Sequence, residues 1–211
     1  MRFEIEMLGV VWFYLIMLGI VRADSSGILL ETIAVTEFGT LKVGNELPSF
    51  NGLTSVSERL SSRTLIGNGR VVVVSYAATW CHPCRNGIPI IERVVHADET
   101  VQAVYIALDK ESFKVQRWAA ELAIQSPVIV DKFNAIAKRH GVVAEQGDQP
   151  TEIPLTIIVN EKGIVTQILT TEGTDFELKL REAIADAQNT SGVQTEGAHP
   201  VGPSDQKRST H

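Results

Sequence analysis

The chain has 211 residues, of which 44% are apolar and 21% are charged, as in an ordinary globular protein. Its formal net charge at pH 7 is −6, and no run of basic residues is longer than a pair such as Lys138-Arg139, which argues against a nucleic-acid partner. Once two tails are set aside, about 150 residues remain, which is enough for one hydrophobic core.

Residues 1–23 are predicted to direct export. The stretch 8–21 is uncharged over 14 residues, a length that suits the hydrophobic region of a signal peptide and is short for a membrane span. Ala23 offers the small residue that precedes a cleavage site. Because Glu4 and Glu6 make the preceding residues acidic rather than basic, an uncleaved signal anchor stays open, and so does a buried core helix. The predicted location is periplasmic or otherwise extracytoplasmic.

The next stretch leads to a buried strand. Residues 24–39 are predicted to be a linker, although Thr32–Val35 would also suit a short strand. Glycine, asparagine and serine then mark turns as far as residue 70. Val71–Ala77 is a continuous apolar run broken only by one serine, which predicts a strand buried on both faces.

Both cysteines of the chain follow that strand in a C-x-x-C motif. Cys81 and Cys84 lie in a short loop, and the apolar spacing after them predicts a buried helix over Arg85–Val95. Strand, C-x-x-C loop and helix form the context in which this motif is typical of dithiol redox chemistry. A structural disulfide would more often close a long loop. We expect Cys81 to be exposed at the tip of the loop and Cys84 to be covered by the helix.

Metal binding by these cysteines is disfavoured. A structural zinc site and an iron–sulfur cluster normally need four ligands, and the chain has no third cysteine. A c-type haem site requires histidine directly after the second cysteine, where this chain has Arg85. No metal and no other cofactor is predicted. The histidines outside the motif also form no ligand pair at short spacing: His96, His140, His199 and His211.

Strands and helices alternate in the rest of the core. Asp131 is predicted to cap the helix over residues 133–137, and Gly141 is predicted to end that helix. The order predicts a mixed central sheet with helices on both faces. The predicted strands are 101–108, 127–130, 155–159 and 164–169, the last two forming a hairpin, and the predicted helices are 111–123, 133–137 and 176–187. Residues 188–211 lack periodicity and are predicted to be a disordered tail.

Three segments, in the right order, resemble the thioredoxin superfamily, and in particular its extracytoplasmic ResA/TlpA-type thiol–disulfide oxidoreductases. Val72–Cys84 is similar to the active-site strand and loop, Val43–Phe50 to the segment before the N-terminal hairpin, and Ile153–Gly163 to the cis-proline strand and its turn. The resemblance implies an α/β domain over residues 40–187. Its expected fold is thioredoxin-like, a mixed central β-sheet flanked by helices on both faces, with an N-terminal hairpin extension.

The resemblance also implies roles for the residues of the motif. Cys81 is expected to be the nucleophile, because a helix N-terminus stabilises a thiolate, and Cys84 the resolving thiol. An imidazolium at His82 would favour the Cys81 thiolate and make the disulfide more oxidising, unless His82 is only a solvated loop residue. Pro83 is expected at the first helical position. Trp80 is expected to be a packing and docking surface beside the disulfide.

Two further residues complete the expected site. The resemblance implies a cis peptide bond before Pro154, which would face the disulfide. Ile153 would then offer its backbone to a substrate strand. Propensity alone would not predict the cis bond, since only about 5–6% of such bonds in folded proteins are cis. A trans proline at the edge of a strand is the alternative.

One expected residue is missing. Ser75 stands where many cytosolic thioredoxins carry a buried carboxylate that helps to deprotonate the second cysteine. Serine cannot act as that base at neutral pH. Glu145 and Glu152 are the replacements that the sequence suggests, in the long polar approach to Pro154. This polar segment is either a loop that recognises partners or an ordinary solvated loop.

The favoured function is thiol–disulfide exchange with exported proteins, as a reductant recharged by a membrane electron donor. The partners would be protein thiols or disulfides of the cell envelope, in cytochrome maturation or related chemistry. An oxidant that introduces disulfides stays open, because His82 favours that direction. A peroxidase of the peroxiredoxin type is disfavoured, because Val74 and Ala78 stand where its P-x-x-x-T-x-x-C loop needs proline and threonine. A non-catalytic binding module is disfavoured by the intact C-x-x-C motif.

Overall fold

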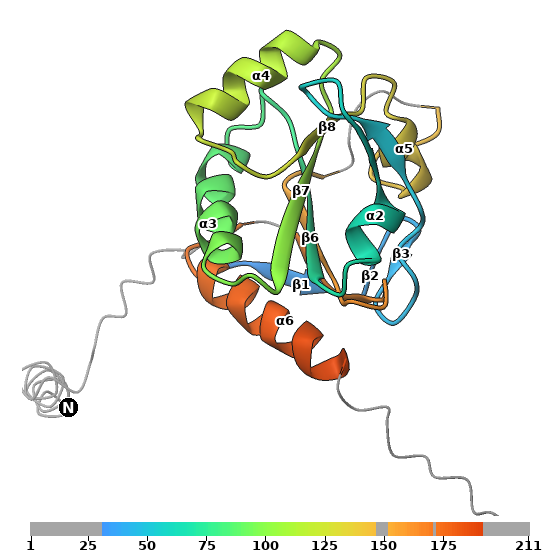
Figure 1. The fold of residues 1–211 in the computed structure, drawn as a ribbon, viewed down its shortest axis with the longest axis vertical. Helices are drawn as coiled ribbons and strands as arrows, with labels where there is room; N and C mark the ends of the chain where they lie inside the picture. Colours follow the sequence, from blue (N-terminus) through green and yellow to red (C-terminus); the bar gives the residue numbers. More distant parts are fainter. Residues whose placement is uncertain (1–30, 147–151, 171, 192–211) are drawn as a thin grey trace, which may run out of the picture.

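The structure, a computed structural model, describes residues 31–146, 152–170 and 172–191 (Figure 1). A six-stranded sheet forms its centre, in the order β1-β10-β9-β6-β7-β8. Its strands are β1 (Ile33–Val35), β6 (Val71–Ala77), β7 (Val101–Ala107), β8 (Val128–Val130), β9 (Leu155–Val159) and β10 (Val165–Thr170). Two hairpins, β2 (Glu37–Phe38) with β3 (Leu41–Lys42) and β4 (Asn51–Leu53) with β5 (Arg59–Ser61), precede β6. The mixed sheet and the N-terminal hairpins confirm the predicted thioredoxin-like fold.

The central strand is β6, and all seven of its residues are buried. It pairs in parallel with β7 and antiparallel with β9, so it is covered along both edges as well as on both faces. Buried strands of this kind form from continuous apolar runs, because neither face has to be polar. The dithiol loop follows the carboxyl end of β6 and is therefore held by the most buried element of the molecule.

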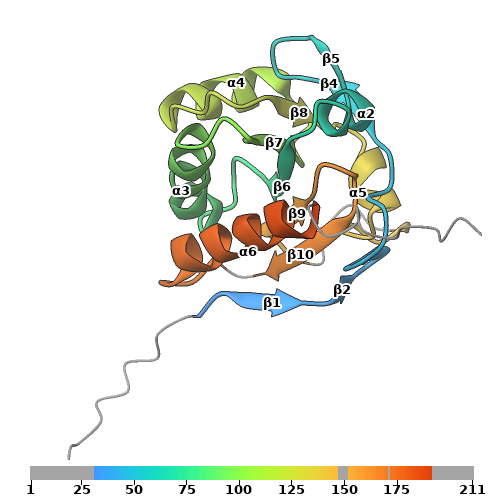
Figure 2. The same cartoon turned by 60° about the horizontal axis from the view of Figure 1, so that its bottom comes forward.

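Helices cover both faces of the sheet (Figures 1 and 2). On one face, α3 and α6 pack together, and Tyr105 of β7 donates a hydrogen bond to Glu92 of α3. Ser75 pairs with Tyr105 across β6 and β7 and faces the same way, whereas its neighbour Tyr76 points to the opposite face and contacts His140. The helices are α2 (Ser62–Ile66), α3 (Cys84–His96), α4 (Ser112–Glu121), α5 (Ala135–Arg139) and α6 (Phe176–Ser191).

The predicted cap of α5 is wrong. The helix begins after Asn134, which has a φ of 55°, so Asp131 lies four residues before its first turn. Asp131 instead uses its side chain to accept the N–H of Ala137, 2.8 Å away, across the intervening turn. Phe133, predicted to be helical, lies in that turn and is 78% exposed. Gly141 ends the helix as predicted, with a φ of 71° that favours glycine.

Two predicted boundaries also differ from the structure. Ile33–Val35, placed in the linker by the sequence, form β1 and pair with β10 at the edge of the sheet. The alternative of a short strand was therefore the right one. At the other end α6 continues to Ser191, which is four residues beyond the predicted end of the helix at residue 187. The predicted leader 1–23 and residues 192–211 lie outside the described residues. None of the helices in the described ranges has the length and hydropathy needed to cross a bilayer.

Candidate functional site

The two cysteines are joined by a disulfide directly after β6. The Cα atoms of Cys81 and Cys84 are 5.4 Å apart. Only 4% of Cys81 and 1% of Cys84 are exposed. The expectation of an exposed Cys81 is therefore wrong for the disulfide form, in which its side chain is turned inward toward Cys84. Cys81 remains the more accessible of the two.

The start of α3 points a backbone donor at Cys81. The N–H of Cys84, the first residue of the helix, donates to the Cys81 sulfur over 3.3 Å. Amides at a helix N-terminus have no partner within the helix and carry partial positive charge. They would stabilise negative charge on the Cys81 sulfur once the disulfide opens. Pro83 lies one residue before the helix, at the N-cap rather than at the predicted first position, and its φ of −59° is already helical.

The surface around the disulfide is partly aromatic. Trp80 is 56% exposed, and His82 and Pro83 are exposed beside it. Asp109 anchors the loop, because its carboxylate accepts hydrogen bonds from the N–H of Thr79 (2.9 Å) and from the hydroxyl of the same residue (2.6 Å). A pocket of about 280 Å³ adjoins this surface and is lined by Trp80, Leu108, Asp109, Lys110, Glu111, Lys114 and Asn134.

The structure brings Pro154 to the same end of the sheet. The Ile153–Pro154 peptide bond is cis, as the resemblance implied. Leu155, the first residue of β9, pairs with Tyr76, the last residue but one of β6. The proline therefore lies next to the point where β6 leads into the dithiol loop. Pro154 is buried and Ile153 is half-buried.

Neither of the two residues that the sequence suggested in place of the missing carboxylate is buried. Glu145 and Glu152 are both exposed, so neither is a buried base. Glu172, in the segment between β10 and α6, instead has its carboxylate buried against Thr156 of β9. Burial raises the pKa of Glu172 from 4.5 to about 8. No sequence pattern marks this residue, because its position depends on how two distant segments pack.

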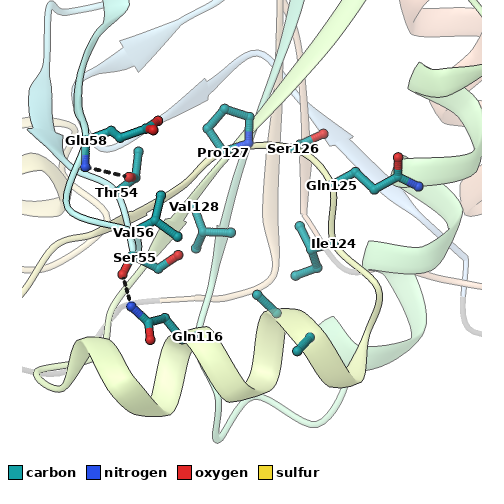
Figure 3. A pocket seen from close by; sticks show the side chains of 12 residues that line it. Thr54, Ser55, Val56, Glu58, Gln116, Ile124, Gln125, Ser126, Pro127 and Val128 are labelled. Atoms are coloured by element: carbon teal, nitrogen blue, oxygen red, sulfur yellow. Dashed lines mark hydrogen bonds between the residues drawn. The ribbon is translucent and has the colours of Figure 1, made fainter.

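Other features of the described residues lie away from the dithiol. A groove of about 520 Å³ lies between the β4–β5 hairpin, α4 and β8. In it Gln116 donates a hydrogen bond to the carbonyl of Ser55 (Figure 3). Its lining includes none of the predicted site residues. Within the ranges that the structure describes, no three His, Cys, Asp or Glu side chains are grouped as metal ligands.

Comparisons with known proteins agree with this geometry. The AhpC/TSA family matches residues 43–168, which is more than half of the chain. Thioredoxin-like protein YneN of Bacillus subtilis is 27% identical over 144 residues, covering 66% of this chain and 78% of YneN. Thiol-disulfide oxidoreductase ResA of Bacillus thuringiensis subsp. konkukian is 22% identical over 141 residues, covering 66% of this chain and 76% of ResA.

Solved structures show the same fold. A protein of Chlorobium tepidum described as the thiol:disulfide interchange protein DsbE superposes with a TM-score of 0.61 at 19% identity, over 70% of this chain and 98% of that one. Peroxidoxin BcpB of Mycobacterium tuberculosis superposes with a TM-score of 0.60 at 16% identity, over 74% of this chain and 99% of that one. At these identities the likeness concerns the fold alone. The chain belongs to the AhpC/TSA family, and its dithiol makes it a thiol–disulfide oxidoreductase with the thioredoxin-like fold.

Proposed function

We propose that this protein exchanges its Cys81–Cys84 disulfide with cysteines of exported partner proteins, as a reductant that a membrane electron donor recharges. The observation that carries the proposal is the disulfide itself, formed at the N-terminus of α3 beside Pro154. Residues 1–23, read as a signal peptide or signal anchor, support export. The similarity to thiol-disulfide oxidoreductase ResA supports thiol–disulfide exchange as the reaction, and the reducing direction is what the resemblance to the extracytoplasmic branch implies.

Each cysteine has a separate role in the proposed cycle. The Cys81 thiolate attacks a disulfide of the partner, forming a Cys81–partner S–S bond and releasing the partner's other cysteine as a thiolate. Cys84 then attacks the Cys81 sulfur, which forms the Cys81–Cys84 bond and releases the partner's first cysteine. The partner gains two electrons and the dithiol loses two. The membrane donor restores the dithiol by the reverse exchange.

The exposed residues around the disulfide would hold the partner. Trp80 offers an aromatic surface beside the sulfur atoms, with His82 and Pro83 adjoining it. The half-buried Ile153 would pair through its backbone with an extended segment of the partner, next to Pro154. An extended segment suits this site, because backbone pairing is independent of sequence and lets one site serve several partners.

A cysteine-trapping experiment tests the roles. Cys84→Ser should accumulate mixed disulfides with envelope proteins, since the second attack is blocked, whereas Cys81→Ser should accumulate none. Both variants are expressed with the leader intact, and the disulfide-linked species are separated by non-reducing electrophoresis. Equal trapping by the two variants would refute the assignment of the nucleophile. Equilibration of the purified domain with glutathione then decides the direction, because a potential well below that of glutathione identifies a reductant.

Peroxidase activity is the competing reaction, since Peroxidoxin BcpB has a similar fold. Val74 and Ala78 leave this chain without the proline and the hydroxyl that a peroxidatic loop needs. We therefore expect the reduced protein to reduce an aromatic disulfide rapidly and hydrogen peroxide no faster than a free thiol does. Peroxide turnover that depends on Cys81 would favour the peroxidase instead.

A further inference from the structure

Glu172 lies where the sequence lacks a base. Ser75 and Thr156 pair across β6 and β9 and face α3, with their hydroxyl oxygens 3.4 Å apart. The Thr156 hydroxyl is also 3.5 Å from Oε1 of Glu172. The three side chains form a row from the position of the missing carboxylate to a carboxylate supplied by a different part of the chain. A resemblance of sequence could not place it, because Glu172 is 97 residues after Ser75.

The second carboxylate oxygen points at α3. Oε2 of Glu172 is buried, with no hydrogen-bond partner among the described residues. It occupies the volume that a Cβ atom on Gly87 would fill, so the absence of a side chain at residue 87 makes room for it. Gly87 follows Cys84 by three residues in the same helix, and Cβ positions at that spacing are about 5–6 Å apart. Oε2 therefore lies beside the face of α3 that carries Cys84, about one helical turn further along the helix.

The titratable groups near Glu172 do not offset the negative charge of its carboxylate. Tyr105 of β7 stays neutral, because burial, followed by the charge of Glu92, raises its pKa well above 10. Glu92 of α3 is held by the hydroxyl of Tyr105 (2.9 Å) and by the N–H of Gln125 (2.7 Å). Asp175, in the same segment as Glu172, accepts the N–H of Thr32. No ion pair to Glu172 occurs within the part of the chain that the structure describes.

We propose that Glu172 exchanges a proton with Cys84 during thiol–disulfide exchange, in place of the carboxylate that related proteins carry at the position of Ser75. The proposal rests on the function proposed above. When Cys84 attacks the mixed disulfide, its thiol proton passes to Glu172, the Cys84–Cys81 bond forms, and the bond between Cys81 and the partner breaks. In the reverse step Cys84 leaves as a thiolate and takes the proton back. A carboxyl whose pKa is raised to about 8 by burial can both accept and release a proton near neutral pH.

Reaction with dithiobis(nitrobenzoate) distinguishes the two cysteines, because they react one after the other. The Cys81 thiolate of the reduced full-length protein releases one coloured thiolate, and the attack of Cys84 releases the second. We expect Glu172→Gln to slow the second release by roughly 10²-fold at neutral pH, because a positioned base contributes about that much. The first release should keep its rate. The deficit should shrink at alkaline pH, where hydroxide deprotonates Cys84 directly.

Two further variants separate proton transfer from folding. Gly87→Ala leaves Glu172 in the sequence but places a Cβ on Oε2, so it should reproduce the slow second release. Glu161→Gln makes the same substitution in an exposed turn and should behave as the wild type. A second release with unchanged rate and unchanged pH profile in Glu172→Gln overturns the proposal. Absence of both releases in the wild-type protein would instead contradict the proposed oxidoreductase function and not the role of Glu172.

Discussion

At the scale of single residues, the site consists of two buried cysteines with different surroundings, of which Cys81, 4% exposed, is the more accessible and Cys84, 1% exposed, the less. A helix amide points at Cys81, and the tryptophan beside it is exposed. Cys84 is covered by the helix that it begins, with a buried carboxylate one turn further on. This asymmetry suits sequential attack, because it favours a thiolate on the first cysteine and leaves the second dependent on proton transfer.

His82 is expected to adjust the redox potential. If its imidazolium stabilises the Cys81 thiolate, His82→Ala destabilises the reduced form and moves the potential to more negative values. A loss of about 1.4 kcal/mol corresponds to about 30 mV for this two-electron couple. Equilibration of the wild type and of His82→Ala with glutathione measures the difference. Because His82 is exposed, an unchanged potential would show that solvent screens its charge and that the helix terminus activates Cys81.

Glu172 is expected to destabilise the protein at alkaline pH. Its folded-state pKa of about 8 lies above the ordinary 4.5, so its contribution to stability is complete below about pH 4.5 and is lost as pH rises through 8. Glu172→Gln should therefore unfold with a free energy about 1–3 kcal/mol higher than the wild type at about pH 9, and the gain should disappear at about pH 5. Urea denaturation of the oxidised proteins measures it, with Glu161→Gln as the control. A constant difference across this range would show that the carboxylate is not buried in solution.

At the scale of elements, one histidine joins three segments that are distant in sequence. His140, at the end of α5, is completely buried. Its Nε2 donates to the carbonyl of Pro48, 2.9 Å away, so its Nδ1 must accept from the hydroxyl of Tyr76, 2.7 Å away. The neutral ring thus connects α5 to β6 and to the segment before the β4–β5 hairpin, on the face of the sheet opposite α3.

This connection predicts loss of stability in acid. Burial lowers the pKa of His140 from 6.5 to about 4, so its contribution to stability is complete above pH 6.5 and is lost as pH falls toward 4. The loss is on the order of 3 kcal/mol once the ring is protonated in the unfolded chain. Urea denaturation between about pH 4 and pH 7 should show this slope in the wild type and a shallower one in His140→Gln. Equal slopes would mean that other groups cause the acid sensitivity.

At the scale of the whole molecule, the N-terminal part of the domain forms one edge of the central sheet. β1 pairs with β10, and Thr32 is tied to the segment before α6 by the carboxylate of Asp175 (2.7 Å) and by the N–H of Gly173 (3.0 Å). These contacts hold β10, the strand that leads into the segment containing Glu172. The edge strand β1 therefore helps to fix the position of Glu172, the proposed proton-transfer group, although it does not contain that residue.

Truncation tests the contribution of β1. A chain that begins at Thr36 should be less stable than one that begins at Glu31 by roughly 1–3 kcal/mol, because it loses a strand pairing and the contacts of Thr32. Thermal unfolding of both chains, each ending at residue 191, measures the difference. Equal unfolding midpoints for the two chains would mean that residues 31–35 contribute no stability, as expected of the linker that the sequence suggested for residues 24–39.

The sequence by itself determined the elements that are specified locally. The run Val71–Ala77 is apolar on both faces apart from one serine, so it is a central strand in any fold of this class. The C-x-x-C loop before an apolar helix predicted the dithiol, and Gly141 marked the end of α5 through its positive φ. These features depend on residues within a few positions of one another.

Only the tertiary structure decided the features that depend on distant contacts. The sequence left Thr32–Val35 open between a linker and a short strand, and the pairing of Ile33–Val35 with β10 decided for the strand. Asp131 resembles a cap in sequence, yet its partner is set by the turn that Asn134 makes. Glu172 is a glutamate in a polar loop until α3 covers it, with Gly87 leaving the space for its carboxylate. Burial and the pKa shift that follows from it belong to packing, which joins residues that the sequence keeps far apart.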